Sequence, residues 1–132
     1  MSKKLAVGID IGGTLTKVGF VDTKGELYAH LEFPTQGYSD VDDYISILAL
    51  KIQYLEKQLS FNFDMVGLGI GAPNANYYRG TIEHAANLEW KGIIPFVSKV
   101  KAHFNVPIYM TNDANAAAIG EVVYGDAKKM RD

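Results

Sequence analysis

Two carboxylates in this chain each follow an apolar run, where a strand would end and a ligand could be held. Asp10 follows the apolar run that starts at Leu5. Asp113 follows Val106-Pro107-Ile108-Tyr109-Met110 and the polar pair Thr111-Asn112. Ligands of open α/β sheets bind beyond the carboxyl ends of the strands. A carboxylate at such a place can hold Mg²⁺ or accept a proton from a substrate hydroxyl.

The first carboxylate opens a segment with the residue types of a phosphate site. Two glycines let backbone amides approach an anion with no Cβ in the way, and successive N–H groups form an anion-binding nest. Threonine hydroxyls can donate, a lysine supplies charge, and Asp10 could hold Mg²⁺ directly or through water. The candidates for binding phosphate are Asp10, Gly12, Gly13, Thr14, Thr16 and Lys17. A plain β-hairpin with an exposed lysine is the alternative interpretation.

The second carboxylate stands at a junction between a strand and a helix. The residues after Asp113 include Ala114, Ala116, Ala117 and Ala118, which favour a closely packed helix. Taken alone, Asp113 is typical of an N-cap that satisfies free amide groups. The other interpretation is a reactive carboxylate at the sheet edge, kept ionised by the helix dipole.

The elements that must position these residues follow from periodicity. Three strands at 5–11, 16–21 and 26–33, joined by short turns, predict an antiparallel meander. The later elements are predicted as an amphipathic helix at 40–59 with Ser39 and Asp42 in a capping box, a strand at 65–70, a small hairpin at 77–83, a helix from Ile93 to Phe104, a strand at 106–110 and the alanine helix. This order implies a mixed sheet with helices on its faces.

Composition narrows the classes of protein. The chain has 132 residues, the size of one domain, and is 48% hydrophobic. Its net charge of −2 gives no reason to expect nucleic acid or an anionic membrane as a partner. There is no cysteine, and no apolar run approaches the ~20 residues that span a bilayer. We therefore expect a soluble cytoplasmic protein.

Competing motifs fail on inspection. The P-loop pattern G-x-x-x-x-G-K-[ST] is absent. The glycines at 67, 69 and 71 do not form G-x-G-x-x-G, and no helix start follows them, so a dinucleotide site is unsupported. His30, His84 and His103 lack the spacing of zinc ligands.

The motifs, taken together, resemble a known family. Asp10-x-Gly12-Gly13-Thr14-x-x-Lys17 resembles the first phosphate motif of the superfamily of sugar kinases and actin. The remaining motifs resemble the ROK family (repressors, ORFs, kinases), and specifically its glucokinases. They are Gly69-x-Gly71-x-Pro73, Gly80, Asn87-Leu88-x-Trp90 and Asn112-Asp113-x-Asn115-Ala116-Ala117-x-x-Gly120-Glu121.

The resemblance implies a fold and a division of the chain. It implies an α/β, actin-like ATPase (ribonuclease H-like) N-terminal domain, with a mixed five-stranded sheet and helices on its faces. Residues 1–125 would form this domain, and 126–132 would begin the connection to a C-terminal domain. The family's zinc site and adenine pocket belong to that second half, so this chain alone is expected to be inactive.

The resemblance also implies a reaction. ROK kinases transfer the γ-phosphoryl group of Mg-ATP to a sugar hydroxyl, and the glucokinase motifs make a hexose, glucose first, the expected substrate. It assigns the general base to Asp113, sugar binding to Asn87 and Asn112, and the ATP phosphates to the Gly12–Thr14 loop. It further implies small-molecule partners only, with a homo-oligomeric full-length protein.

One position departs from the family pattern. The family usually has glycine after the proline of Gly-x-Gly-x-Pro, whereas Asn74 follows Pro73 here. We expect Asn74 to adopt the left-handed conformation, which Asn tolerates better than most residues. Its side chain could alter sugar specificity, so we count it among the substrate-binding residues.

Two other functions stay open from the sequence. A sugar-responsive transcriptional regulator of the same family needs a DNA-binding module, which we do not expect here because the first strand starts about four residues from Met1. A non-catalytic sugar-binding module is the second alternative. Trp90 could form a sugar platform, although a single Trp is more typical of core packing.

Overall fold

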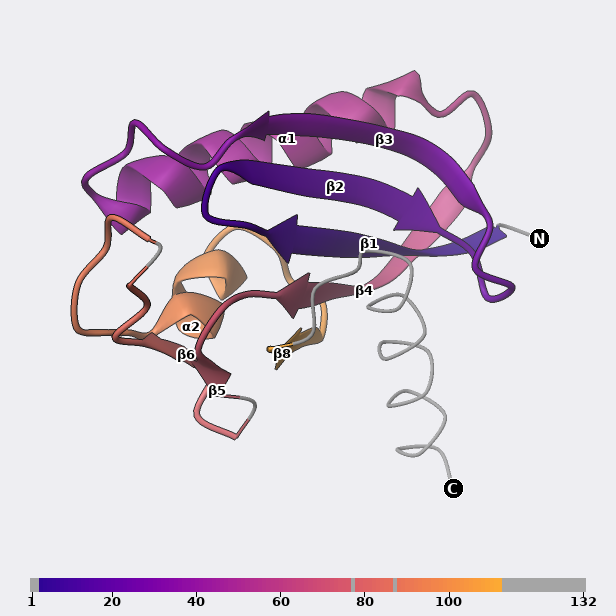
Figure 1. The fold of residues 1–132 in the computed structure, drawn as a ribbon. Coiled ribbons are helices and arrows are strands. Elements are labelled where there is room, and N and C mark those ends of the chain that lie inside the picture. Colours follow the sequence, from indigo (N-terminus) through magenta and orange to yellow (C-terminus); the bar gives the residue numbers. More distant parts are fainter. Residues whose placement is uncertain (1–2, 77, 87, 113–132) are drawn as a thin grey trace.

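The computed structural model describes residues 3–76, 78–86 and 88–112 (Figure 1). Its elements follow in the order β1 (Lys3–Ile11), β2 (Leu15–Val21), β3 (Leu27–Pro34), α1 (Val41–Gln58), β4 (Phe63–Gly71), β5 (Ala75–Asn76), β6 (Thr81–Glu83), β7 (Ile93–Ile94), α2 (Phe96–Lys101) and β8 (Ile108–Thr111).

The main sheet has five strands in the order β3-β2-β1-β4-β8. β1, β2 and β3 form the predicted antiparallel meander, while β4 pairs parallel to β1 and β8 pairs parallel to β4. The arrows of β1, β4 and β8 therefore point the same way in Figure 1, and their carboxyl ends meet at one edge of the sheet. The prediction of a mixed five-stranded sheet is confirmed.

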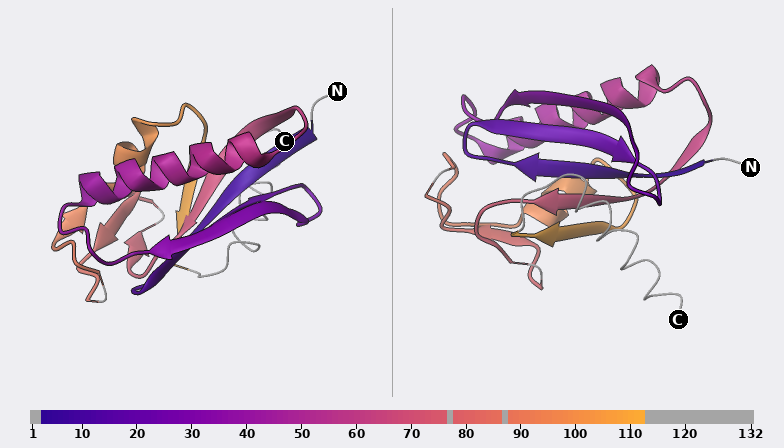
Figure 2. Two further views of the ribbon diagram at one scale, coloured as in Figure 1. Left: turned by 90° about the horizontal axis from the view of Figure 1, so that it is seen from above. Right: turned by 45° about the vertical axis from the view of Figure 1, so that its right-hand side comes forward.

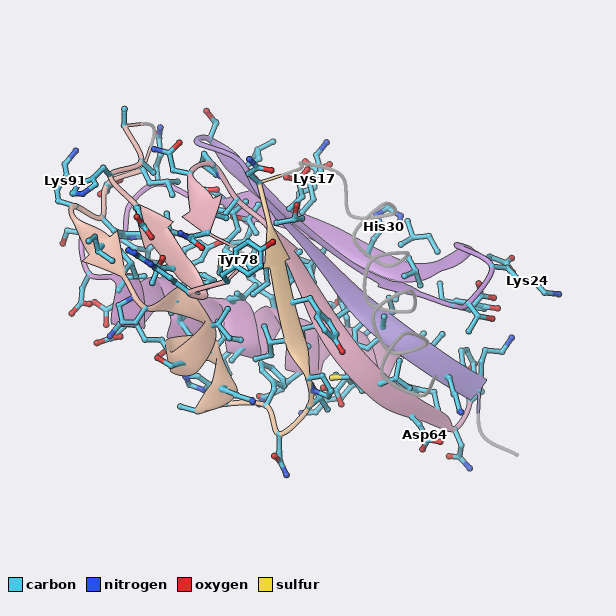
Figure 3. All side chains as sticks on the ribbon, turned by 90° about the horizontal axis from the view of Figure 1, so that it is seen from below. Lys17, Lys24, His30, Asp64, Tyr78 and Lys91 are labelled. Atoms are coloured by element: carbon cyan, nitrogen blue, oxygen red, sulfur yellow. The ribbon has the colours of Figure 1, made fainter. Side chains whose placement is uncertain are left out.

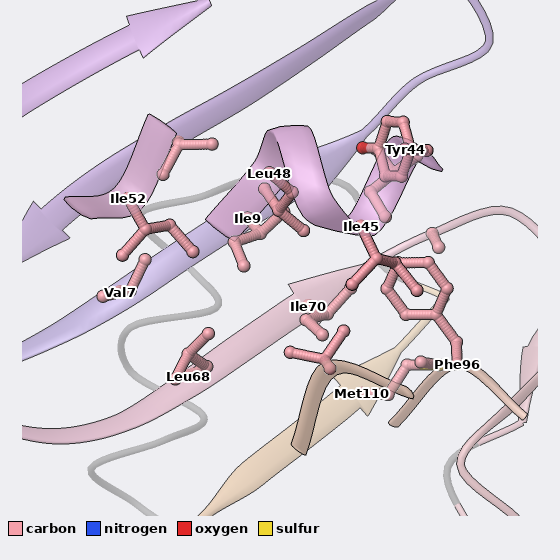
Figure 4. Close-up of a cluster of buried hydrophobic side chains, with 14 of the residues drawn as sticks. Val7, Ile9, Tyr44, Ile45, Leu48, Ile52, Leu68, Ile70, Phe96 and Met110 are labelled. Atoms are coloured by element: carbon pink, nitrogen blue, oxygen red, sulfur yellow. The ribbon is translucent and has the colours of Figure 1, made fainter. Parts of the chain in front are cut away.

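Helix α1 crosses one face of this sheet (Figure 2). Its apolar residues recur at helical spacing, and Tyr44, Ile45, Leu48 and Ile52 are buried. Figure 4 shows them packed onto side chains of β1 and β4. The predicted capping box was wrong by one residue, because Asp40 is the N-cap and its side chain accepts from the amide of Asp42.

Both described helices lie on the same face of the sheet. Phe96 and Val100 of α2 belong to the same buried cluster as Ile9 of β1 and Leu48 of α1. The alanine helix predicted after Asp113 lies outside the described residues. Among the helices that are described, none combines the length and the hydropathy needed to cross a membrane.

The opposite face of the sheet carries the alternate residues of each strand. Ala6, Val21, Val66 and Tyr109 form a second, smaller apolar cluster there. Side chains alternate between the two faces of a strand. Because Ile9 and Ile11 belong to the α1 side, Asp10 must point to the opposite side.

A small second sheet follows β4. β5 and β6 form a hairpin whose first strand lies just before the predicted range of 77–83, and β7 adds to β6 with Ile82 opposite Ile94. The prediction of one helix from Ile93 to Phe104 was therefore wrong at its start. Ile93 and Ile94 form a strand, and α2 begins only after Pro95, which has no N–H to offer a helix interior.

Candidate active site

The carboxyl edge of the parallel strands brings the sequence motifs together. Asp10 of β1 is level with Gly71 of β4, and Gly71 is level with Thr111 of β8. Neighbouring strands lie about 4.8 Å apart, so the backbones at Asp10 and Thr111 are separated by about 10 Å. The exposed Asn112 directly follows Thr111. Asp113, predicted as the base, lies outside the described residues.

Asp10 and Lys17 face each other at this edge. They are Cα partners across β1 and β2, and both point away from α1. Burial raises the pKa of the Asp10 carboxyl, and the nearby charge of Lys17 acts in the opposite direction. Figure 3 shows Lys17 at the end of the sheet where β8 also ends, with Lys24 at the far end. A partly buried carboxylate beside a cation is a suitable place for a metal-bound phosphate group.

The turn between β1 and β2 is a tight glycine hairpin. The amide of Gly12 donates to the carbonyl of Leu15 at 2.9 Å. A Cβ on Gly12 would lie 2.9 Å from that same carbonyl oxygen, so a larger residue would force the turn to move. Gly13 is half-buried and Thr14 is exposed, so a ligand can reach the tip of the hairpin.

The structure corrects the prediction for Thr16. Thr16 pairs with Ile11 and lies on the α1 side of the sheet, opposite to Asp10 and Lys17. It is completely buried, and its hydroxyl lies 2.7 Å from those of Thr35 and Tyr44. Its hydroxyl is therefore part of the core, so we remove Thr16 from the candidate phosphate ligands.

Asn74 adopts the expected left-handed conformation, with φ of 57°. Its side-chain amide donates to the carbonyls of Glu83 and His84, at 3.0 and 3.1 Å. This is the conformation expected of asparagine at the position where the resemblance implies glycine. Both N–H groups of the side chain are used by backbone carbonyls, which leaves only its oxygen for a sugar.

Trp90 belongs to the core. It is 4% exposed, its ring centroid lies 4.5 Å from that of Tyr44, and it stacks on Phe96 at 6.1 Å. Its indole N–H donates to the carbonyl of Tyr38 at 2.9 Å. Its neighbour Asn87, predicted to bind sugar, lies outside the described residues.

Sequence reasoning did not connect Thr35 and Tyr44 with Thr16, or Tyr38 with Trp90, although the structure brings them into contact. Tyr44 lies within the amphipathic helix that the sequence predicts at 40–59. No local signal could have joined it to Thr16, because the two are 28 positions apart. Only the packing of α1 across the sheet brings them together.

The donor set fits a magnesium ion held mainly by a nucleotide. No group of three or more His, Cys, Asp or Glu side chains suited to a metal occurs within the described ranges. Mg²⁺ usually needs only one or two carboxylates in addition to substrate phosphates and water. Asp10 can supply that single carboxylate beside the glycine hairpin.

The chain is similar to a family of known proteins. The sequence model of the ROK family matches residues 6–132. The chain is 35% identical to a glucokinase of Halalkalibacterium halodurans over 131 residues, covering 95% of the chain and 38% of the relative. It is also 30% identical to a xylose repressor of Caldicellulosiruptor bescii, covering 96% of the chain and 32% of the relative.

Solved structures give the same result. A ROK family glucokinase from Streptomyces griseus, in complex with glucose and AMPPNP, superposes with a TM-score of 0.72 at 30% identity. That match covers 92% of this chain and 37% of the other. A ROK hexokinase from Thermus thermophilus has a TM-score of 0.68 at 25% identity, covering 84% and 36%.

The chain thus spans less than two fifths of the curated relatives it matches, 38% of the first of them. The match covers nearly all of the chain itself and includes the glycine hairpin, the Pro73 loop and the Asn112 edge. The chain belongs to the ROK family, and its mixed sheet is that of the glucokinase-like ROK sugar kinases, which have the actin-like ATPase fold.

Proposed function

We propose that this chain is the N-terminal half of an ATP-dependent hexose kinase, with glucose as the preferred substrate. The observation that carries the proposal is the shared edge where Asp10, Gly71 and Thr111 stand level on three parallel strands. The relatives named glucokinase and the neighbour bound to glucose and AMPPNP support the choice of substrates.

Each end of this edge has its own task in the proposal. The hairpin tip at Gly13 and Thr14 receives the phosphates of ATP, and Lys17 contributes positive charge beside Asp10. Mg²⁺, when bound, neutralises charge that develops on the phosphate oxygens. Asp10 holds the ion directly or through water. Phosphoryl transfer depends mostly on such positioning and charge stabilisation.

The sugar occupies the other end of the edge. In the proposal, Asn87 and Asn112 hydrogen-bond its hydroxyls, because each side chain offers both a donor and an acceptor. Asp113 accepts the proton of the attacking hydroxyl as the bond from that oxygen to the γ-phosphorus forms, while the bond from the γ-phosphorus to the bridging oxygen breaks and ADP leaves. A base in this role typically contributes ~10²–10⁴-fold to the rate.

The test is turnover by the full-length protein. Purified protein is incubated with Mg-ATP and a panel of hexoses, and the sugar phosphate is identified by ³¹P NMR. We expect a phosphorylated hexose, with the highest kcat/KM for glucose. A protein that binds sugar but forms no sugar phosphate with any hexose would contradict the proposal.

A DNA-binding assay tests the regulator alternative, which the similarity to a xylose repressor raises. A sugar-responsive regulator would bind a specific DNA fragment and release it when sugar is added. We expect the full-length protein to shift no specific DNA. A specific, sugar-sensitive shift without turnover would favour the regulator.

A further inference from the structure

Residues 35–38, here called the connector, contact both the glycine hairpin and the segment around Trp90. The connector leaves β3 beside the glycine hairpin and leads toward α1. At its start, the amide of Thr35 donates to the carbonyl of Thr14 at 2.9 Å. At its end, the carbonyl of Tyr38 accepts from the indole N–H of Trp90 at 2.9 Å.

A third bond lies between these two. The amide of Gly37 donates to the side-chain carboxylate of Glu89 at 2.8 Å. The connector therefore contacts the hairpin with one end and the segment around Trp90 with the other. These two regions are about 75 positions apart in the sequence, and the proposed function gives one the ATP phosphates and the other the sugar.

A buried chain of hydroxyl groups links the connector to β2 and α1. The hydroxyl of Thr16 lies 2.7 Å from that of Thr35 and 2.7 Å from that of Tyr44. Thr16 and Tyr44 are completely buried, and Thr35 is 4% exposed. Three hydroxyls in series satisfy one another where no water can, so the loss of one leaves a buried polar group short of a partner.

Tyr44 contacts both β2 and the residues at the end of the connector. Its hydroxyl is bound to Thr16 in β2, while its ring contacts Trp90 at 4.5 Å and Tyr38 at 5.9 Å between centroids. Burial raises the pKa of Tyr44 far above its usual value, so the hydroxyl keeps its proton. A neutral hydroxyl can still donate or accept, so the contact persists over the whole working pH range.

We propose that the connector sets the distance between the glycine hairpin, which receives the ATP phosphates, and the segment around Trp90, which contributes to sugar binding. Thr35 and Tyr44 are then positioning residues for phosphoryl transfer. This inference rests on the proposed function. In-line transfer needs the sugar hydroxyl and the phosphate held in register, and a displacement of about 1 Å can cost ~10²-fold in rate. Substrate affinity depends less on that register.

The experiment measures kcat and KM of full-length variants that remain folded by circular dichroism. Thr35→Val and Tyr44→Phe remove a hydroxyl with little change of shape, and we expect kcat to fall on the order of 10-fold while both KM values change less than about 3-fold. Thr35→Ser keeps the hydroxyl and should retain the wild-type kcat. Tyr54→Phe is the matched control, because Tyr54 is 56% exposed on the same helix.

A second measurement separates misalignment from partial unfolding. The double variant of Thr35 and Tyr44 should lose about as much kcat as either single variant, because both break one chain of contacts. Wild-type kcat in a folded Tyr44→Phe variant would overturn the inference, and so would a loss in Thr35→Ser equal to that in Thr35→Val. If Thr35→Val does not fold, Tyr44→Phe decides alone, since it keeps every ring contact. Absence of turnover in the wild type would instead refute the proposed function.

Discussion

Asp10 and Lys17 stand directly opposite each other on β1 and β2, on the face of the sheet that α1 does not cover. No ion pair within 4.0 Å joins them to any described residue. The carboxylate is half-buried; burial raises its pKa, and the charge of Lys17 acts in the opposite direction. In the proposed function, this is the carboxylate that would hold the magnesium ion of Mg-ATP.

The first prediction concerns Asp10→Asn. Burial raises the pKa of Asp10, so the ionised carboxylate destabilises the folded state. Removal of the charge should therefore leave the midpoint of thermal unfolding unchanged or higher. Affinity for Mg-ATP should weaken on the order of 10-fold to 100-fold, the range for residues that support a metal. Thermal melts and calorimetric titration measure both quantities.

The control is Asp64→Asn, an exposed carboxylate near the start of β4, far from the site edge. It should leave Mg-ATP affinity unaltered. A large loss of stability in Asp10→Asn, or full retention of Mg-ATP affinity, would argue against a metal-binding role.

The second prediction concerns how the stabilities of wild type and Asp10→Asn depend on pH. A folded-state pKa above the unfolded value, near 3.9, means that ionisation destabilises the fold. At pH 3, wild type and Asp10→Asn should have equal stability. As the pH rises through the raised pKa of Asp10, the wild type should become the less stable of the two. Urea unfolding at several pH values tests this prediction. A wild type that is more stable than Asp10→Asn at pH 7 would refute it.

The third prediction concerns Asp22 in the turn between β2 and β3. Its carboxylate accepts from the amides of Glu26 and Lys24 and from the hydroxyl of Tyr28, each at 2.9 Å. These bonds, that of Glu26 first, lower the pKa of Asp22. Its contribution to stability is therefore complete above about pH 3.9 and is lost as the pH falls through the lowered pKa.

Asp22→Asn should unfold at a lower temperature than wild type at pH 7, and the difference should shrink toward pH 2. Its kcat should match that of wild type, because the turn lies at the opposite end of β2 from the glycine hairpin. A difference in stability that persists undiminished at low pH would contradict this assignment.

The fourth prediction compares two substitutions of Asn74. Alanine at a φ of 57° costs about 1–2 kcal/mol in backbone strain and also loses two hydrogen bonds worth about 1 kcal/mol each. Glycine at position 74 also loses the two hydrogen bonds, but it adopts the left-handed conformation without strain. Asn74→Ala should therefore be less stable in urea than Asn74→Gly. Equal stabilities would mean that the left-handed backbone is not what asparagine provides.

Much of the fold could be predicted because its signals are local. Strand alternation, the turn residues of Gly12-Gly13 and Asp22-Thr23-Lys24-Gly25, and the apolar period of α1 each lie within a short window. The left-handed Asn74 was also predictable, because only a few residue types tolerate that conformation.

The predictions that were wrong or incomplete depend on contacts between residues far apart in the sequence. Ile93 and Ile94 form a strand only because Ile82 and Glu83 lie beside them, a pairing that no local period encodes. Thr16 and Lys17 both looked suitable for phosphate, but the register of β2 turns the first toward α1 and the second toward the site. The contact of Tyr38 with Trp90 spans 52 positions, so packing alone reveals it.

The most direct test of the account is the turnover of Asp113→Asn in the full-length protein, measured beside its affinity for hexose. The account predicts that kcat falls ~10²–10⁴-fold while the variant stays folded and its dissociation constant for glucose changes little. A folded Asp113→Asn variant that phosphorylates glucose at the wild-type rate would contradict it.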